Sequence, residues 1–189
     1  MLKKTQIVLL VILVIGILIS LISCRDLASV STETFLVEET VAPVATTDIS
    51  EIKAEPMENE IITGDIVWKI LNVNDQGPSI VSSHDYTYKA IIGKFIILEF
   101  IIRNNSGESR ILYNLNVIDS SGRVFSLCLP AYAYFSTPEK ACALVDILSE
   151  VDYTFEAPFD VSPDSEDLIL EVTDLMNPPV NKAYIDLGI

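Results

Sequence analysis

The chain has 189 residues and carries 12 basic against 27 acidic side chains, which gives a formal net charge of −15. This length suits one domain of ordinary size with extensions and is short for two. Because a strongly acidic surface repels phosphate backbones, the charge excludes nucleic acid as a partner class.

The N-terminus has the order of a secretory signal peptide. Lys3 and Lys4 precede an apolar run, residues 7–22, which ends at Ser23 and Cys24. The segment Leu21-Ile22-Ser23-Cys24 resembles the lipobox of bacterial lipoproteins, in which the cysteine receives a diacylglyceryl group and the peptide is cut just before it. The resemblance makes residues 1–23 a signal peptide and Cys24 the lipid attachment site. The alternative is an uncleaved membrane helix, for which the run is near the lower length limit.

Residues 24–60 have the composition of a tether. They are rich in Ser, Thr, Glu, Val, Ala and Pro, and they hold nine acidic residues against two basic ones. Such a segment buries too little apolar surface to offset the entropy of ordering it. We therefore expect a disordered acidic tether that holds the domain away from an anionic membrane surface. A short strand or helix around residues 34–37 is the alternative.

Residues 61–189 show a two-residue hydrophobic period, which is typical of strands. The segment 93–104 is the clearest: Ile96, Leu98, Phe100 and Ile102 share one face, and the other face is half apolar, which indicates a central strand. Strands are also predicted over residues 66–70, 111–117, 124–127, 151–157, 168–172 and 183–187, with a hairpin turn at 119–123. The pattern predicts an all-β antiparallel sandwich, with little helix.

A resemblance to a known family rests on turn and strand residues. They are Gly64-Asp65 opening a strand, the run 93–98 leading to Asn104-Asn105-Ser106-Gly107, the turn 119–123, and the strand 151–158. This order resembles bacterial lipoprotein domains described as telokin-like, or immunoprotective extracellular immunoglobulin, folds. The resemblance implies an immunoglobulin-like β-sandwich over residues 61–189 and says almost nothing about chemistry.

The cysteines leave two alternatives open. With Cys24 lipidated, Cys128 and Cys142 remain as a pair that can form a disulfide in an oxidising compartment. Such a bridge would contribute about 3 kcal/mol. The alternative is two buried free thiols that act as small hydrophobic side chains. No CxxC spacing or neighbouring histidine is present, so no metal or other cofactor is expected.

The sequence does not predict an enzyme. Its one histidine, His84, lies in a polar loop, and no glycine-rich phosphate loop is present. The acidic loop 160–167 lacks the spacing and central glycine of an EF-hand, and we interpret it as a solvated turn.

Five aromatic residues fall outside the clearest strands and are candidate binding residues: Tyr86, Tyr88, Tyr132, Tyr134 and Phe135. The alternative is that Tyr132, Tyr134 and their neighbours form another packed strand. The function expected is a membrane-anchored, extracytoplasmic, non-enzymatic binding module whose partner is an envelope protein or cell-wall glycan. The alternative is an accessory structural lipoprotein without a discrete ligand. A contiguous exposed tyrosine patch favours binding, and burial of the tyrosines favours the structural role.

Overall fold

The computed structural model describes residues 47–50, 52–82, 86–134 and 140–189, all within one compact unit, Val41–Ile189. One sheet has the strand order β11-β6-β3-β2, and its strands are β2 (Ile61–Thr63), β3 (Ile66–Gly77), β6 (Lys94–Asn104) and β11 (Asp152–Val161). We call it the long-strand sheet. The other has the order β1-β13-β12-β8-β9, with β1 (Ala54–Pro56), β8 (Asn116–Ile118), β9 (Val124–Ser126), β12 (Ile169–Thr173) and β13 (Lys182–Asp186).

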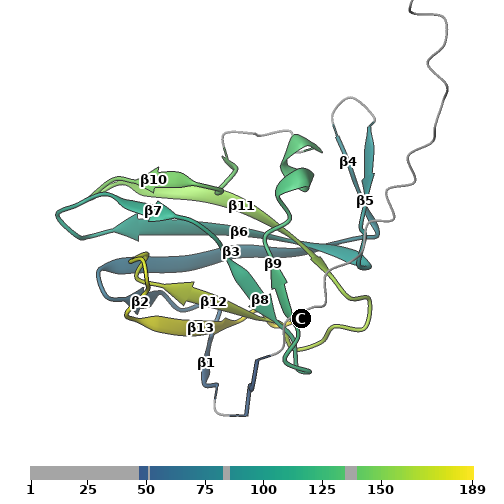
Figure 1. Cartoon of the computed structure of the whole chain (residues 1–189), viewed down its shortest axis with the longest axis horizontal. Coiled ribbons are helices and arrows are strands. Elements are labelled where there is room, and N and C mark those ends of the chain that lie inside the picture. The colour runs from purple at the N-terminus through teal and green to yellow at the C-terminus, as the bar shows by residue number, and fades with distance from the viewer. Residues whose placement is uncertain (1–46, 51, 83–85, 135–139) are drawn as a thin grey trace, which may run out of the picture. The chain divides into compact units, whose positions relative to one another are not determined.

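The two sheets form the layers of an antiparallel β-sandwich, which confirms the predicted fold class (Figure 1). Two small ribbons extend it, one of β7 (Arg110–Leu112) with β10 (Val145–Ile147) and one of β4 (Ser79–Val81) with β5 (Thr87–Lys89). The described residues also include a 3-10 helix, η1 (Leu129–Tyr134). This helix replaces the packed strand that was the alternative for Tyr132 and Tyr134.

The core follows from the alternation of apolar residues. Trp68 of β3 and Phe100 of β6 are fully buried, and their ring centroids lie 5.9 Å apart. The Trp68 indole N–H donates to the Thr63 hydroxyl oxygen at 3.0 Å and to the Thr173 carbonyl oxygen at 3.1 Å. Because Thr173 belongs to the other sheet, this side chain joins the two layers as well as filling the space between them.

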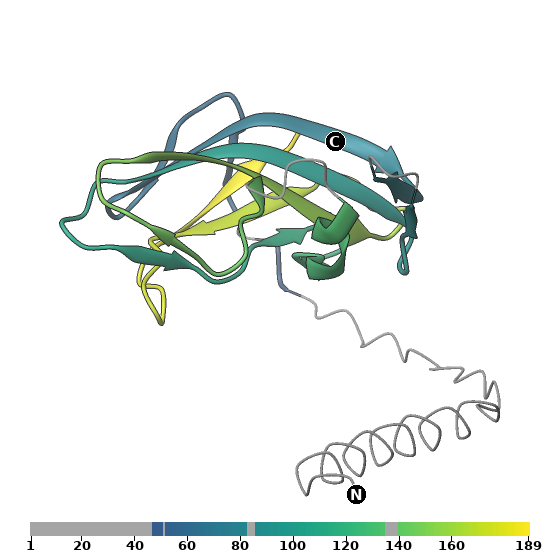
Figure 2. The same ribbon diagram turned by 90° about the horizontal axis from the view of Figure 1, so that it is seen from above.

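The apolar residues on the outer side of β6 differ in how far other parts of the fold cover them. Near its start, Phe95 is fully buried in a second cluster with Ile80 of β4 and Ala131 of η1. The β4–β5 hairpin and η1 lie toward the same end of the sandwich and supply this cover (Figures 1 and 2). Farther along β6, Ile101 also faces outward but is not part of that cluster. The predicted central position of this strand is confirmed, since β6 lies between β3 and β11.

Two predicted boundaries differ from the structure. Residues 111–117 were expected to form one strand, but β7 pairs with β10 and β8 pairs with β12 and β9, so the chain passes from one ribbon to another sheet in between. The range 24–60, predicted as a tether, contains β1, which pairs in parallel with β13. The sheet therefore begins at Ala54. The alternation alone could not reveal either point, because the pairing partners lie far away in sequence.

The sandwich has two distinct ends. At one, which we call the entry end, the Thr47 N–H donates to the carbonyl oxygen of Gly122 in the β8–β9 turn at 2.7 Å. Gly122 has a φ of 76°, and a Cβ atom there would lie 2.2 Å from the Thr47 carbonyl oxygen, so this contact needs glycine. The opposite, far end carries the β2–β3 turn and the loops 105–109 and 174–181. The Thr63 hydroxyl donates a hydrogen bond to the Thr173 carbonyl oxygen, so β2 of one sheet and β12 of the other both end there.

Candidate functional site

The structure does not gather the candidate aromatic residues into one exposed patch. Tyr86 is 70% exposed. Tyr88 is half-buried in the second cluster, 5.7 Å from the ring of Phe95. Tyr132 packs against the main core. The side chain of Tyr134 and all of Phe135 lie outside the described residues, so the described tyrosines give neither a continuous surface nor complete burial.

Cys128 and Cys142 are free cysteines in the structure, so the bridge considered from the sequence is not formed there. The reason is their placement: Cys142 lies in the main core, 2.8 Å from the Tyr132 hydroxyl, whereas Cys128 packs against the second cluster. Burial raises the pKa of the Cys142 thiol to about 11 and also raises the pKa of Cys128 and of Tyr132. A protonated buried thiol is a poor nucleophile. Cys24, the predicted lipid attachment site, lies outside the described residues.

The acidic loop 160–167 uses its carboxylates within the protein. Asp160 accepts hydrogen bonds from three consecutive backbone N–H groups, those of Ile91 at 2.6 Å, Ile92 at 3.0 Å and Gly93 at 3.1 Å. Asp164 pairs with the Arg123 guanidinium at 3.0 Å. Among the described residues, no group of three or more His, Cys, Asp or Glu side chains is placed to hold a metal ion. His84 lies outside these residues.

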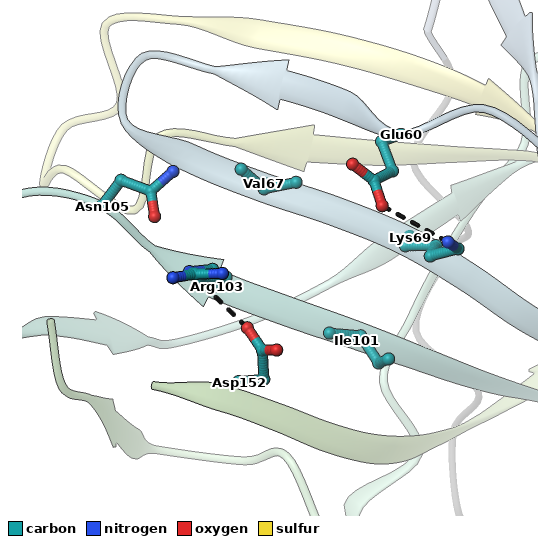
Figure 3. A pocket seen from close by; sticks show the side chains of 7 residues that line it. All are labelled: Glu60, Val67, Lys69, Ile101, Arg103, Asn105 and Asp152. Atoms are coloured by element: carbon teal, nitrogen blue, oxygen red, sulfur yellow. Dashed lines mark hydrogen bonds and ion pairs between the residues drawn. The ribbon is translucent and has the colours of Figure 1, made fainter. Parts of the chain in front are cut away.

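A groove of about 420 Å³ crosses the outer face of the long-strand sheet (Figure 3). We call it the sheet-face groove. Its lining residues come from the N-terminal side of β2, from β3, from β6 and the residue after it, and from the start of β11: Glu60, Val67, Lys69, Ile101, Arg103, Asn105 and Asp152. Strand register brings them together, since Arg103 pairs with both Val67 and Asp152 and Ile101 pairs with Lys69.

The charged residues of the sheet-face groove are paired with one another. The Lys69 ammonium lies 3.3 Å from Glu60, and the Arg103 guanidinium lies 3.7 Å from Asp152 (Figure 3). Arg103 also lies 3.3 Å from Glu150. The apolar residues Val67 and Ile101 lie between these pairs. Beside them Ile62, which pairs with Val67 across β2 and β3, is 68% exposed. The face therefore combines one exposed and two half-buried aliphatic side chains with a rim of ion pairs, an arrangement that is common in protein interfaces.

A second cleft, of about 340 Å³, lies at the far end of the sandwich. We call it the Tyr113 cleft. Tyr113 belongs to the segment that joins β7 to β8, and its side chain is 50% exposed. The apolar lining consists of Ile111, Tyr113, Leu175, Met176 and Pro179, and the polar lining consists of Asn114, Glu171, Thr173 and Asn177. An aromatic wall, aliphatic groups and a few polar groups are the features of a small-molecule site.

One wall of the Tyr113 cleft is fixed by a single carboxylate. Asp174 accepts hydrogen bonds from the backbone N–H groups of Met176 at 3.2 Å, Val180 at 3.2 Å and Asn181 at 2.8 Å, and from the Asn181 side chain at 2.9 Å. Burial raises the pKa of Asp174, but these hydrogen bonds outweigh it and leave the pKa below its usual value. The ionised carboxylate therefore holds the 174–181 loop in one shape.

Sequence reasoning missed both surfaces. Their lining residues come from strands and loops far apart in the chain, and only the register places them side by side. One signal was present: the apolar outward positions of the 93–104 segment, which include Ile101. That signal predicts burial of the outward positions, and this holds for Phe95 and in part for Ile97, which packs against the same cluster, but less for Ile101. Tyr113, placed inside a predicted strand, gave no signal of a binding site.

In the part of the chain that the structure describes, none of the helical structure has the length and apolar character needed to cross a membrane.

No family model and no curated protein matches the chain. Its structure is similar to that of the yjhA protein of Bacillus subtilis, with a TM-score of 0.52 and 12% identity over 70% of this chain and 98% of that chain. A conserved hypothetical protein of Bacillus anthracis gives a TM-score of 0.50 and 14% identity over 72% of this chain and 100% of that one. The candidate lipoprotein ycdA of Bacillus subtilis gives 0.48 and 12% over 71% and 40%. At these identities, what the chain shares with the first two proteins is the fold.

Proposed function

We propose that this chain is a lipid-anchored, extracytoplasmic module without enzymatic activity that binds a protein partner through the sheet-face groove. The location rests on the sequence: a basic start, an apolar run and the lipobox-like segment that ends at Cys24. Two acyl chains on one cysteine would hold the protein stably at a membrane, because each buried methylene contributes about 0.8 kcal/mol.

The sheet-face groove carries the binding part of the proposal. On the same side of β6, Phe95 is fully buried by other parts of the fold, whereas Ile62 is 68% exposed and Val67 and Ile101 are only half-buried. Leaving these aliphatic side chains in water costs free energy that a partner would recover by covering them. Because Lys69 and Arg103 are already neutralised by neighbouring carboxylates, the groove should select an apolar complementary surface and not a charged one.

The absence of catalysis is part of the proposal. Cys128 and Cys142 have raised pKa values, and the carboxylates of Asp160 and Asp174 accept hydrogen bonds from backbone N–H groups. None of these side chains is both activated and open to a substrate.

Site-specific photocrosslinking in intact cells tests the proposed interface. A photoreactive residue at position 62, on the edge of the groove, should give a discrete adduct with one envelope protein. The control is position 81 on β4, where Val81 is 59% exposed but lies in another part of the surface. Adducts of equal yield and identity at both positions, or no adduct at position 62, would contradict the proposed binding surface.

A further inference from the structure

We propose that the Tyr113 cleft is a second, independent binding site, whose ligand is an N-acetylated glycan segment. The hydrophobic core does not need the Tyr113 ring, because the neighbouring Leu112 and Leu115 already supply the buried apolar residues of this segment. A half-exposed aromatic ring at the wall of a cleft offers a flat apolar face with a polar tip. The C–H face of a pyranose ring has the shape and character to stack on it.

The polar lining matches the rest of a sugar. Hydroxyl groups both donate and accept hydrogen bonds, and so do the carboxamides of Asn114 and Asn177. The Glu171 carboxylate supplies further acceptors and is held in place by the Lys182 ammonium, 3.1 Å from each of its oxygens, and by the Tyr184 hydroxyl at 3.4 Å. β12 therefore holds one carboxylate in place beside the two asparagines that line the cleft.

The charge of the cleft indicates an uncharged ligand. Glu171 is the only ionisable group in the lining apart from the Tyr113 phenol, and Lys182 neutralises it. In a chain with a net charge of −15, this leaves a locally neutral site. An anionic ligand would meet no free cation among the lining residues, and a cationic one would have to displace Lys182 from its pair.

The aliphatic wall distinguishes an N-acetylated sugar from an unmodified one. Leu175, Met176 and Pro179 line the cleft beside the two asparagines. An acetamido group carries a methyl, which would pack on this wall, and an amide, which would pair with a carboxamide. The hydrogen bonds that Asp174 accepts fix the wall before the ligand arrives, so little ordering cost falls on binding.

Calorimetric titration tests the inference. The full chain, purified in detergent, is titrated with the tetramer of β-1,4-linked N-acetylglucosamine and with the corresponding glucose tetramer. We expect saturable binding of the acetylated tetramer and weaker binding of the glucose tetramer. Tyr113→Ala should weaken binding by about tenfold or more, and Tyr113→Phe, which keeps the ring, should retain most of it. Tyr86→Ala is the matched control, because Tyr86 is more exposed and lies outside the cleft.

Three outcomes would overturn the inference. They are no binding of either tetramer or of purified insoluble cell wall, unchanged affinity in Tyr113→Ala, or tighter binding at the same cleft of an uncharged peptide such as tetra-alanine with both termini blocked. Equal affinity for the two tetramers would remove the role of the acetamido group. The result is separable from the proposed protein interface, because position 62 and Tyr113 belong to different surfaces and the two experiments have different readouts.

Discussion

At the scale of single residues, buried carboxylates in this domain organise loops. Asp174 accepts hydrogen bonds from three backbone N–H groups and one side chain, and its pKa lies below the usual value of an aspartate even though burial acts in the opposite direction. Asp119 is also held by its surroundings: it accepts hydrogen bonds from the backbone N–H groups of Ser121 and Arg123 and pairs with the Arg123 guanidinium at 2.6 Å. In both cases a short acidic side chain accepts hydrogen bonds from the backbone of a loop that has no regular secondary structure, and so stabilises its conformation.

Replacing Asp174 tests this role through pH. A group whose pKa is lowered by folding contributes stability above its unfolded pKa of about 3.9, and this contribution is lost as the pH falls through the folded value. Asp174→Ala should therefore cost about 2 kcal/mol at pH 7, and the gap between variant and parent should narrow near pH 3. Urea unfolding at both pH values measures it. A gap of constant size would show that the ionised carboxylate is not what stabilises the loop.

At the scale of elements, the start of the domain is the clearest difference between expectation and structure. The acidic composition up to Glu60 predicts no packed structure, yet β1 pairs with β13 at Ala54–Tyr184, Glu55–Ile185 and Pro56–Asp186, and Met57 packs against the core. Such pairing needs a partner strand at the other end of the chain, and local composition does not contain that information.

Three chains with different first residues separate the contributions of this region. A chain that begins at Glu60 loses β1 and should melt about 5 °C or more below one that begins at Thr47, since about 1 kcal/mol is lost with the pairing. A chain that begins at Lys53 keeps β1 but loses the Thr47–Gly122 hydrogen bond, and it should fall between them. Calorimetric melting measures all three. Equal melting temperatures would show that β1 adds nothing to stability.

The strands with clear alternation could be predicted because one face of each is buried. The segment 93–104 becomes β6, and the four residues expected on its inner face are fully buried: Ile96, Leu98, Phe100 and Ile102. The prediction of one strand over residues 111–117 was wrong because apolar and polar residues continue to alternate there while the chain changes its partner strands. The short β4, β5 and β10 were missed because three residues carry too little periodicity. Neither surface was predicted, since the sheet-face groove combines residues from four separate segments and the Tyr113 cleft joins residues 111–114 to residues 171–179.

At the scale of the whole molecule, the two ends of the sandwich differ in what they carry. The described chain enters at the Gly122 turn, whereas the Tyr113 cleft and the Arg103 side of the sheet-face groove lie toward the far end. If Cys24 is lipid-anchored as we propose, the end at which the described chain begins and the binding surfaces are separated along the long strands. A partner could then approach without meeting the lipid surface.

The anchor is tested by Cys24→Ala. Because the variant lacks the thiol that would receive the lipid, we expect release from membranes or accumulation of uncleaved precursor. Fractionation of cells and mass measurement of the chain give the answer. Cys128→Ala is the matched control and should remain membrane-bound. Normal processing and retention of the Cys24 variant would contradict lipid attachment at this residue.

The contact between Thr47 and Gly122 also has a mechanical consequence. Among the described residues, the first backbone contact that tension from the N-terminal side would load is the hydrogen bond from Thr47 to Gly122. The three residue pairs between β1 and β13 take it next. The long strands β3, β6 and β11 come later in the chain, so they bear the tension only after the hydrogen bond and the β1–β13 pairing have broken. The N-terminal contacts of the domain can thus break under tension while the sheet-face groove and the Tyr113 cleft keep their shape.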